Sequence, residues 1–550
     1  MSSRCPFKLR GVVLAAVVLG LCANLSADKA LNAKIDSLLK SLGRASTRKV
    51  AREQLNAIGA PAIPRLIQHV KGSSLAMRAM ALSALQTCWS PEALDAVTGA
   101  LVDRNKTVRD MAHSALRLNL SGDELSAAMS KLADSRSVLI AGPALQSSDR
   151  AAPDAARMAR ALARSGMWKY LDRVLPRYHS PTLTPAARKM LDRGAIEQKI
   201  TAICGLIHQQ DNSPQTRAKI AKRLRLGTPR LRAMAAEYMR WHGGQEDLDA
   251  LKNALKGERD VYCRAALDEA VAAIGRRAEL FKDAPDTPSP KWPDEPTKAY
   301  RTAIDLLKKH PTRSARASVL KLLASAEPFE PLHYYRGRST TAGAGRNSAR
   351  FELLTLVSGY PAVRQDATYH LKDSPPPATQ PSAMKLMPPV RDYFDPKRKS
   401  FGSAVSGAKG PFSGTYHVGD DVAWHRPQST VVAIGDGEVK IASVGVASWG
   451  GFVVIEHTGD KSGPFCSLYG HLGPLVCVRP GRKVRRGQKI ASLGRSFTWT
   501  NGGYGTHLHF GIRKGLFSRG GFTGYLPPAK FKSGAAGWTD PQKFVRARLK

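Results

Sequence analysis

The residues of this sequence that could do chemistry are histidines and an aspartate in three short motifs near its C-terminus. The motifs are His417-Val-Gly-Asp-Asp421, then Tyr-Gly-His471-Leu, then His507-Leu-His509. Imidazole nitrogens and a carboxylate oxygen are the ligands that a catalytic zinc ion usually takes from a protein, with one position left open to water. Bound zinc lowers the pKa of that water and polarises a carbonyl group. The motifs therefore predict metal-assisted hydrolysis of an amide bond.

Strand geometry explains the spacing within the motifs. Successive side chains of a β-strand point to opposite faces, so residues two or four positions apart share a face. We therefore expect His417 and Asp421 to share one face, and His507 and His509 to share another. Two neighbouring strands could bring these groups to one point. Asp420 would point the other way, which makes Asp421 the better ligand candidate.

The region from about residue 412 to 515 resembles the lysostaphin/LytM-type family of zinc metallopeptidases. The resemblance rests on the three motifs in their order and on three glycine-punctuated segments, at 432–439, 450–457 and 484–490. A His-x-His motif alone is weak, because chance yields it easily in a chain of this length. The ordered set of motifs is far more specific.

The resemblance assigns roles to five residues. It implies that His417, Asp421 and His509 bind one Zn²⁺ ion per chain. It implies that His471 and His507 act in catalysis, where one imidazole can take the proton of the attacking water and another can stabilise the oxyanion. It also implies that the substrate is the peptide part of peptidoglycan.

The sequence departs from the family pattern at two places. Thr506 precedes the His-x-His motif where the family often has proline. Some members use a tyrosine upstream of the first motif, but Pro411 and Phe412 occupy that neighbourhood here. Tyr416 is adjacent to His417 and should face away from it on a strand. We therefore assign no tyrosine to the site.

Other candidate residues have ordinary interpretations. His425 and His457 are expected to be surface or core side chains, and Asp420 a solvated loop carboxylate. Trp499 and Tyr504 lie in an apparent insertion before the His-x-His motif. They could line a substrate groove or only pack the loop.

The elements that position the motifs are expected to be strands. From Phe401 onward, short β-branched and apolar runs alternate with glycine turns, which is an all-β pattern. The clearest runs are 430–434, 437–444, 452–457 and 489–493. The resemblance implies an antiparallel lysostaphin-like fold, a duplicated hybrid motif, for a peptidase domain at 396–550.

The first half of the chain is rich in Ala, Leu and Arg and carries an internal repeat. An arginine is followed by apolar or small residues at +3, +6 and +7, offsets that lie largely on one helix face. The repeat begins at Arg78, Arg109, Arg232, Arg264 and, more loosely, Arg52. It resembles HEAT-type repeats, which implies an all-α solenoid over 28–281 that serves as a binding scaffold. A plain helical bundle is the alternative. Residues 282–395, with proline-rich segments, are expected to be a linker containing a helical patch.

The first residues have the order of a secretory signal peptide, 1–27. A basic start is followed by an apolar run from Gly11 to Cys22 and then by small residues, with cleavage expected after Ala27. The apolar run is too short for a spanning helix. We therefore predict export to the periplasm or cell envelope, with no transmembrane span after cleavage.

Net charge is the unusual feature of the composition. The chain has 84 Lys and Arg against 44 Asp and Glu, which gives +40, and a surface of this kind attracts polyanions. Nucleic acid and anionic envelope polymers both fit the charge, but export and the absence of a basic-aromatic motif exclude nucleic acid as the predicted partner.

Five cysteines remain after the signal segment. Cys88, Cys204 and Cys263 lie in helical apolar patterns and are expected in the core. Cys466 and Cys477 could pair across neighbouring strands or remain as buried thiols.

Together the observations predict a secreted zinc metallo-endopeptidase that hydrolyses peptide cross-links of peptidoglycan. The solenoid would position the enzyme or bind an envelope protein. The alternative is a non-catalytic LytM-like regulator or scaffold of cell-wall hydrolases, against which the intact set of five residues argues.

Overall fold

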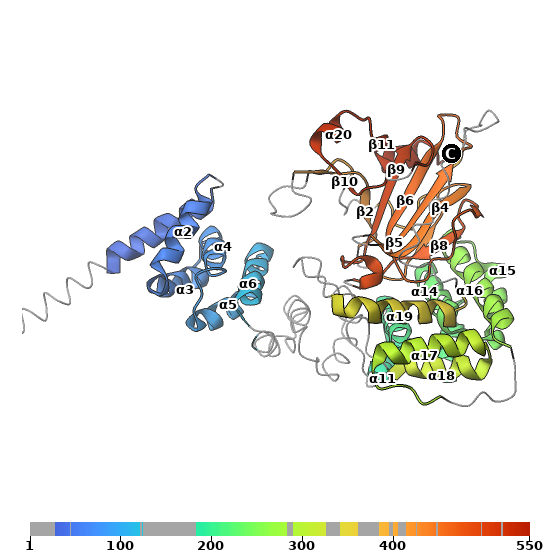
Figure 1. Cartoon of the computed structure of the whole chain (residues 1–550). Coiled ribbons are helices and arrows are strands. Elements are labelled where there is room, and N and C mark those ends of the chain that lie inside the picture. The colour runs from blue at the N-terminus through green and yellow to red at the C-terminus, as the bar shows by residue number, and fades with distance from the viewer. Residues whose placement is uncertain are drawn as a thin grey trace, which may run out of the picture. The chain divides into compact units, whose positions relative to one another are not determined.

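The chain folds into two compact units, Met1–Pro153 and Asp154–Lys550, in a computed structural model (Figure 1). Each unit is considered by itself. The predicted signal segment 1–27 and His425 lie outside the described residues. The described residues are 28–44, 46–120, 124, 183–282, 290–325, 341–360, 384–394, 400–404, 414–424, 426–446, 449–496, 498–518 and 521–549.

The first unit is helical in its described part. After a helix at 28–42, its elements are α2 (Arg48–Ile58), η1 (Ala60–Ala62), α3 (Ile63–Lys71), α4 (Leu75–Ala84), η2 (Pro91–Ala93), α5 (Leu94–Ala100) and α6 (Lys106–Asn119). The Ser74 hydroxyl and the Asn105 side-chain oxygen accept backbone N–H bonds at the starts of α4 and α6, as N-cap residues do. Leucines such as Leu39, Leu66 and Leu82 are fully buried between the helices.

The repeated arginines share one local structure. Four of them donate to a backbone carbonyl oxygen five or six residues earlier, in the turn that leads into the helix: Arg78, Arg109, Arg232 and Arg264. Arg78 also pairs with Asp103 at 2.9 Å, and the carbonyl of Asp103 accepts from Arg109. In the second unit the corresponding residues are Arg232, Glu258 and Arg264. An acid six residues before the next arginine therefore belongs to the repeat, and the sequence pattern above missed it.

The second unit begins with a helical layer. Its described helices are α11 (Leu183–Arg193), α12 (Ile196–His208), α13 (Pro214–Arg223), α14 (Pro229–His242), η4 (Gln245–Asp247), α15 (Leu248–Gly257), α16 (Val261–Leu280), α17 (Pro296–Lys309), α18 (Arg313–Ser325) and α19 (Thr341–Val357). These helices share one apolar core. The last three lie in the range 282–395, for which the sequence predicted a linker with a helical patch. Buried residues such as Tyr300, Val319 and Leu353 place these helices in the core.

The C-terminal part is an antiparallel β structure, as predicted. Its strands are β1 (Tyr416–His417), β2 (Asp420–Val422), β3 (Thr430–Val432), β4 (Gly437–Val446), β5 (Gly450–His457), β6 (Phe465–Leu472), β7 (Lys483–Val484), β8 (Lys489–Ser492), β9 (Leu508–Lys514), β10 (Tyr525–Leu526) and β11 (Trp538–Thr539). The main sheet runs β11-β9-β6-β5-β4-β7, and β2 pairs with β9. Two smaller ladders join β1 to β10 and β3 to β8. Short helices α20 (Pro528–Lys532) and α21 (Pro541–Arg546) complete the chain.

Both faces of the main sheet are covered by apolar side chains. In β5, Val453 and Ile455 belong to the larger cluster, whereas Phe452 and Val454 belong to a smaller cluster on the opposite face. This alternation follows from the pleat of a strand, which sends successive side chains to opposite faces. Because β5 is buried on both faces, its sequence is a nearly continuous run of apolar residues.

The helical layer packs directly on the β structure through α14 and α16 (Figure 1). α16 contacts β3 and β8, and the Tyr262 hydroxyl donates to the carbonyl of Pro388 at 3.0 Å. Fully buried Glu237 of α14 accepts from Lys489 Nζ at 2.6 Å and from the Ser492 hydroxyl at 3.0 Å, both on β8. Arg240 binds the same carboxylate, at 2.9 Å from its Nε. The contact between helices and strands thus contains a buried ionic network.

Several smaller expectations are also resolved by the structure. Cys88, Cys204 and Cys263 are buried, as predicted. Cys466 and Cys477 are free thiols, so of the two alternatives the unpaired one holds. Among the described residues, no helix is both long and apolar enough to cross a membrane.

The buried network predicts a large cost when its carboxylate is removed. Glu237→Ala leaves Arg240 and Lys489 as buried charges without a counterion, which should lower the free energy of unfolding by about 3–5 kcal/mol. The control is Asp192→Ala, which removes a largely exposed ion pair with Lys219 and should cost less than about 1 kcal/mol. Urea unfolding of the full chain, followed by tryptophan fluorescence, measures both. Equal small effects would contradict the predicted importance of the network.

The same interface predicts where the chain can be shortened. Removing residues 28–153 takes away the first unit and should leave the second unit soluble and folded. Removing residues 28–281 also deletes α14 and α16, which exposes Lys489 and the apolar surface beneath them, so this protein should aggregate or unfold. Solubility and circular dichroism of the two truncated proteins check the prediction. A soluble, cooperatively folding shorter protein would show that the β structure does not need the helices.

Candidate active site

The pairing of β2 with β9 brings the first and third motifs together. Asp421 lies directly opposite His509 in this antiparallel ladder. His417, on β1, reaches the same point from the neighbouring two-stranded ladder. His471 stands at the end of β6, which also pairs with β9, one residue after the partner of His509. His507 immediately precedes β9. The structure thus gathers all five predicted residues.

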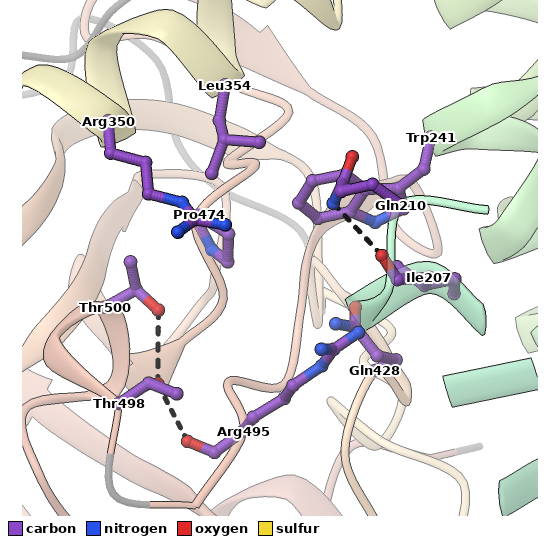
Figure 2. A pocket seen from close by; sticks show the side chains of 10 residues that line it. All are labelled: Ile207, Gln210, Trp241, Arg350, Leu354, Gln428, Pro474, Arg495, Thr498 and Thr500. Atoms are coloured by element: carbon purple, nitrogen blue, oxygen red, sulfur yellow. Dashed lines mark hydrogen bonds between the residues drawn. The ribbon is translucent and has the colours of Figure 1, made fainter. Parts of the chain in front are cut away.

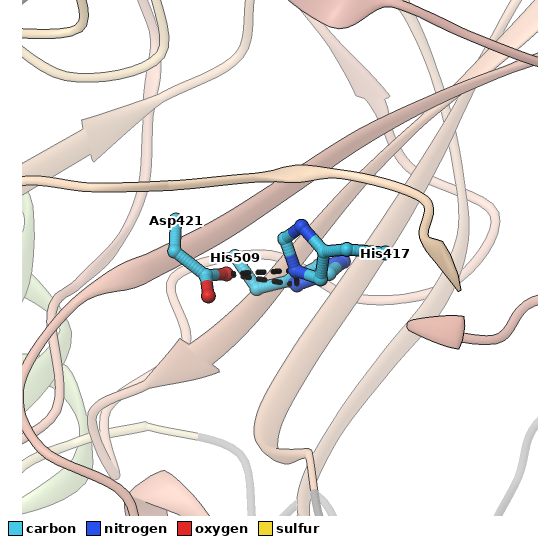
Figure 3. Close-up of side chains that lie close together, drawn as sticks. All are labelled: His417, Asp421 and His509. Carbon is cyan, nitrogen blue, oxygen red and sulfur yellow. Dashed lines mark hydrogen bonds and ion pairs between the residues drawn. The ribbon is translucent and has the colours of Figure 1, made fainter. Parts of the chain in front are cut away.

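Three of these side chains form a compact triangle (Figure 3). His417 Nε2 and His509 Nδ1 are 3.0 Å apart, and each lies 3.1 Å from Asp421 Oδ1. All three residues are buried. Lone pairs on two imidazole nitrogens and a carboxylate oxygen at this spacing call for a cation or shared protons between them. The triangle could therefore hold a metal ion.

Gly419 allows this approach. The first motif is not one strand, as the spacing suggested, but two short strands in different sheets, broken between His417 and Asp420. A Cβ atom at Gly419 would lie 2.6 Å from His509 Nε2 and 2.7 Å from the carbonyl oxygen of Phe510. Any larger residue would push the β9 histidine away from the other two ligands.

The two remaining histidines are held by backbone carbonyls. His471 Nδ1 lies 3.1 Å from the carbonyl oxygen of Asn501, and His507 Nδ1 lies 2.7 Å from that of Gly505. A carbonyl oxygen can only accept, so Nδ1 carries the proton in each neutral ring and Nε2 carries the lone pair. The Nε2 atom of His507 lies 3.5 Å from Asp421 Oδ1, at the edge of the triangle.

His471 also has an unusual backbone. Its φ is +61°, in the left-handed region that L-residues other than glycine rarely adopt. Its N–H donates to the carbonyl of Trp449 at 2.9 Å, and its own carbonyl accepts from Gly494 at 3.0 Å. Backbone strain of this kind persists where surrounding contacts hold it, often at functional sites.

Residues 415–520 match the family described as Peptidase family M23. This part of the chain is a peptidase family M23 domain. The match confirms the predicted resemblance of the C-terminal region, since the LytM-type peptidases belong to this family. The M23 domain contains every residue of the predicted site, from His417 to His509.

Solved structures offer a weaker comparison. Human deoxyhypusine hydroxylase is 17% identical over 46% of this chain and 98% of its own, with a TM-score of 0.19. Escherichia coli YibA is 13% identical over 52% and 98%, with a TM-score of 0.26. An engineered protein is 15% identical over 52% and 87%, with a TM-score of 0.25. Scores this low carry no argument, so the HEAT-type assignment and the solenoid arrangement stay predictions.

The donor set of the M23 domain fits zinc. Bonds of about 2.0–2.1 Å at tetrahedral angles separate zinc ligands by roughly 3.3 Å. The observed 3.0–3.1 Å sides of the triangle are close to that spacing. Two nitrogens and one oxygen, with a fourth position left to water, are the composition of a catalytic rather than a structural zinc site.

Electrostatics favour the ionised form of Asp421 and the neutral form of His509, which are the forms that bind a metal. Burial by itself would raise the pKa of the Asp421 carboxyl, but the positive forms of His507 and His417 hold it well below its usual value. Burial lowers the pKa of His509 to about 4, although its hydrogen bond to Asp421 opposes the shift. Burial and the neighbouring histidines also lower the pKa of His471 well below its usual value. At neutral pH the carboxyl is thus ionised and these two imidazoles are neutral.

Aromatic rings surround the histidines. The Trp424 ring is stacked on His507 with centroids 4.3 Å apart, and Trp424 Nε1 donates to the carbonyl of Asp421 at 3.1 Å. Trp449 lies edge-on to His509 at 5.0 Å. The Tyr504 ring is 4.6 Å from His471, and this half-buried tyrosine lies beside the site rather than in a remote loop.

Some expectations need correction. Asp420 is not a solvated carboxylate: it is 1% exposed, and its oxygens accept from the Tyr393 hydroxyl at 2.8 Å and from the N–H of Phe401. It does point away from Asp421, because it faces the larger core cluster with Tyr393. His457 is a core histidine, as predicted, bonded to the Asp436 carbonyl and the Ser467 hydroxyl.

Sequence reasoning missed two kinds of residue at the site. Trp424 and Trp449 stand next to motifs, and a tryptophan three residues after a ligand aspartate is a signal that could have been used. Asn501 and Gly505 act through their backbone carbonyls, for which the sequence offers no signal.

The triangle predicts a metal stoichiometry. The purified protein should hold about one zinc per chain, and His417→Ala, Asp421→Ala or His509→Ala should reduce this to near zero. Asp420→Asn is the matched control, because it changes the adjacent carboxylate on the opposite face and should keep the metal. Inductively coupled plasma mass spectrometry gives the content of each protein. Full zinc retention by the ligand variants would disprove the site.

Proposed function

We propose that this protein is a secreted zinc metallo-endopeptidase that hydrolyses peptide cross-links of peptidoglycan. One observation carries the proposal: five polar side chains of an M23 domain converge, three of them in a triangle that could hold a metal ion and two as further histidines whose Nδ1 atoms bind backbone carbonyls. The ligands are His417, Asp421 and His509. His471 and His507 are left to handle protons.

Zinc, when bound, would supply a Lewis acid and lower the pKa of a water molecule. The chain's own histidines do the rest. Because Nδ1 of His471 and of His507 already donates to a carbonyl, only Nε2 of each ring can react. The ring that accepts a proton from the attacking water then becomes an Nε2–H donor. It can return that proton to the leaving amine, so that the proton taken from water ends on the product. The second ring can stabilise the oxyanion only in its imidazolium form, with a proton taken from solvent on Nε2.

The substrate class comes from family membership together with charge and export. Peptidase family M23 supports peptidoglycan peptides as the substrate. The chain carries a formal charge of +40, which would concentrate it in an envelope containing carboxylates and phosphates. The basic and apolar start of the sequence, 1–27, supports delivery to the periplasm or cell envelope.

A non-catalytic regulator of wall hydrolases is the second candidate. One observation favours it: none of the five polar side chains is more than 5% exposed, and aromatic rings lie against the histidines. A regulator would need the fold but not open access to the metal. The complete ligand set favours the enzyme, since a regulator has no need to keep His471 and His507.

The proposed roles predict that variants of the two non-ligand histidines lose activity but keep zinc. His471→Ala and His507→Ala should keep about one zinc per chain and should lower kcat by roughly 10²–10⁴-fold. His310→Ala is the control, because His310 is an exposed histidine on the helical layer of the same unit. Zinc content and turnover of a cross-linked muropeptide measure the outcome. Normal turnover by either site variant would refute its catalytic role.

The reaction itself can be read from its products. Purified peptidoglycan treated with the zinc-loaded protein should release muropeptides in which one amide bond of a cross-link has gained one water, leaving a new amine and a new carboxylate. Mass spectrometry locates the bond, and the Asp421→Ala protein is the blank. Products cut in the glycan would contradict the proposal. Absence of products, with wall hydrolysis by another enzyme stimulated, would favour the regulator.

A further inference from the structure

One short segment orients both non-ligand histidines. Residues 498–505, here the carbonyl loop, lie between β8 and β9 and include the 3-10 turn η6 (Trp499–Asn501). The Asn501 carbonyl accepts from His471 and the Gly505 carbonyl accepts from His507. The two histidines come from different strands, yet both depend on the same eight residues for their tautomer.

We propose that the carbonyl loop is a positioning element that holds His471 and His507 in the Nδ1–H tautomer, and that its anchorage on α12 makes the helical layer a support of the active site. Only the expected effect on kcat rests on the proposed function. The tautomers and the anchorage are features of the fold that can be tested without turnover.

The loop is packed closely enough to act as a fixed support. A Cβ atom at Gly450 would lie 2.3 Å from the carbonyl carbon of Asn501, and one at Gly494 would lie 2.4 Å from Asn501 Cβ. Asn501 is fully buried, and its side-chain oxygen accepts from the N–H of Tyr504 at 3.1 Å. The Thr506 hydroxyl donates to the carbonyl of Gly494 at 3.0 Å and ties the end of the loop to its start.

The helical layer reaches the loop through Arg495. Its guanidinium donates to the carbonyl of Cys204 in α12 at 3.0 Å. Its own carbonyl accepts from the Thr498 hydroxyl at 2.9 Å, the first residue of the loop. A chain of hydrogen bonds therefore leads from α12 through Arg495 to Thr498. The backbone of Asn501 continues it, since its N–H donates to the carbonyl of Thr498 at 3.2 Å.

Figure 2 shows the cavity beside this contact. Its volume is about 50 Å³, and Ile207 and Trp241 of the helical layer face Thr498 and Thr500 of the loop across it. The loop is thus pinned to the helices by Arg495 at one side but not packed against them everywhere. Loss of the Arg495 contact would remove the hydrogen bond that ties this segment to α12.

The first test asks whether the side-chain hydrogen bond of Asn501 is needed to hold the carbonyl loop in place. Asn501→Ala removes the acceptor for Tyr504 N–H, whereas Asn501→Ser keeps a shorter acceptor that supports the same kind of turn. In the full-length, zinc-loaded protein we expect Asn501→Ala to lower kcat about 10–100-fold at unchanged KM and zinc content, as misplacement of a proton-transfer group does. Asn501→Ser should recover most of kcat. Equal kcat for wild type and Asn501→Ala would overturn the proposal, as would zinc loss in step with activity.

The second test addresses the anchor. Arg495→Ala should lower kcat several-fold with zinc content unchanged. The matched control is Arg223→Ala, because Arg223 likewise donates to a helix carbonyl, that of Leu191 at 2.8 Å, but within the helical layer. Arg223→Ala should leave kcat unchanged. If both variants behave alike, the helical layer does not support the site through Arg495.

A third measurement does not depend on turnover. In protein carrying ¹⁵N-labelled histidine, imidazole nitrogen shifts distinguish Nδ1–H from Nε2–H rings, and His471→Gln and His507→Gln identify the two signals. Wild type should show both rings as Nδ1–H, and Asn501→Ala should show the His471 signal as a mixture. Nε2–H rings in wild type would overturn the positioning role. If wild type shows the predicted tautomers but cleaves no peptide, the proposed function fails and the positioning inference stands.

Discussion

The C-terminal structure depends on a cluster of groups that would repel one another without a shared cation or proton. Two imidazole nitrogens and one carboxylate oxygen lie 3.0–3.1 Å apart in a buried position. Such a set is stable only if positive charge lies among the three atoms. The pairing of Asp421 with His509 across the β2–β9 ladder fixes one side of the triangle, and Gly419 leaves the space that His509 needs beside it.

A second buried charge set joins the M23 domain to the helices. Burial by itself would raise the pKa of the Glu237 carboxyl, but Arg240 and Lys489 lower it below its usual value. Buried ion pairs add little net stability over apolar packing, yet removing one partner is costly. The network therefore specifies which surface of α14 meets β8. Arg495 and the carbonyl loop follow β8 directly in the chain. The contact between α14 and β8 therefore also helps to position the segment that binds His471 and His507.

Hydrogen bonding divides the five polar residues of the site into two classes. The ligand atoms His417 Nε2 and His509 Nδ1 face each other and Asp421. His471 and His507 instead use Nδ1 to bind backbone carbonyls. Which ring nitrogen faces the centre is thus set by the partner of the other nitrogen. Four histidines in one small volume therefore have two different hydrogen-bonding patterns.

The sequence by itself determined the residues of the site and the antiparallel β structure that carries them. Period-two spacing placed His507 with His509 and separated Asp420 from Asp421, because strand pleating depends only on local backbone geometry. Helical periodicity likewise identified the repeated arginines, although not the acid that precedes each next one.

Only the tertiary structure decided how these parts meet. Asp420 is buried against Tyr393 because of the core that forms beneath β2, which no local pattern encodes. The break of the first motif into two strands depends on the neighbours β9 and β10. The helices of the range 282–395 join a core made by distant segments. Every residue type has a backbone carbonyl oxygen, so the sequence could not indicate that those of Asn501 and Gly505 bind His471 and His507. Only the path of the folded chain places them there.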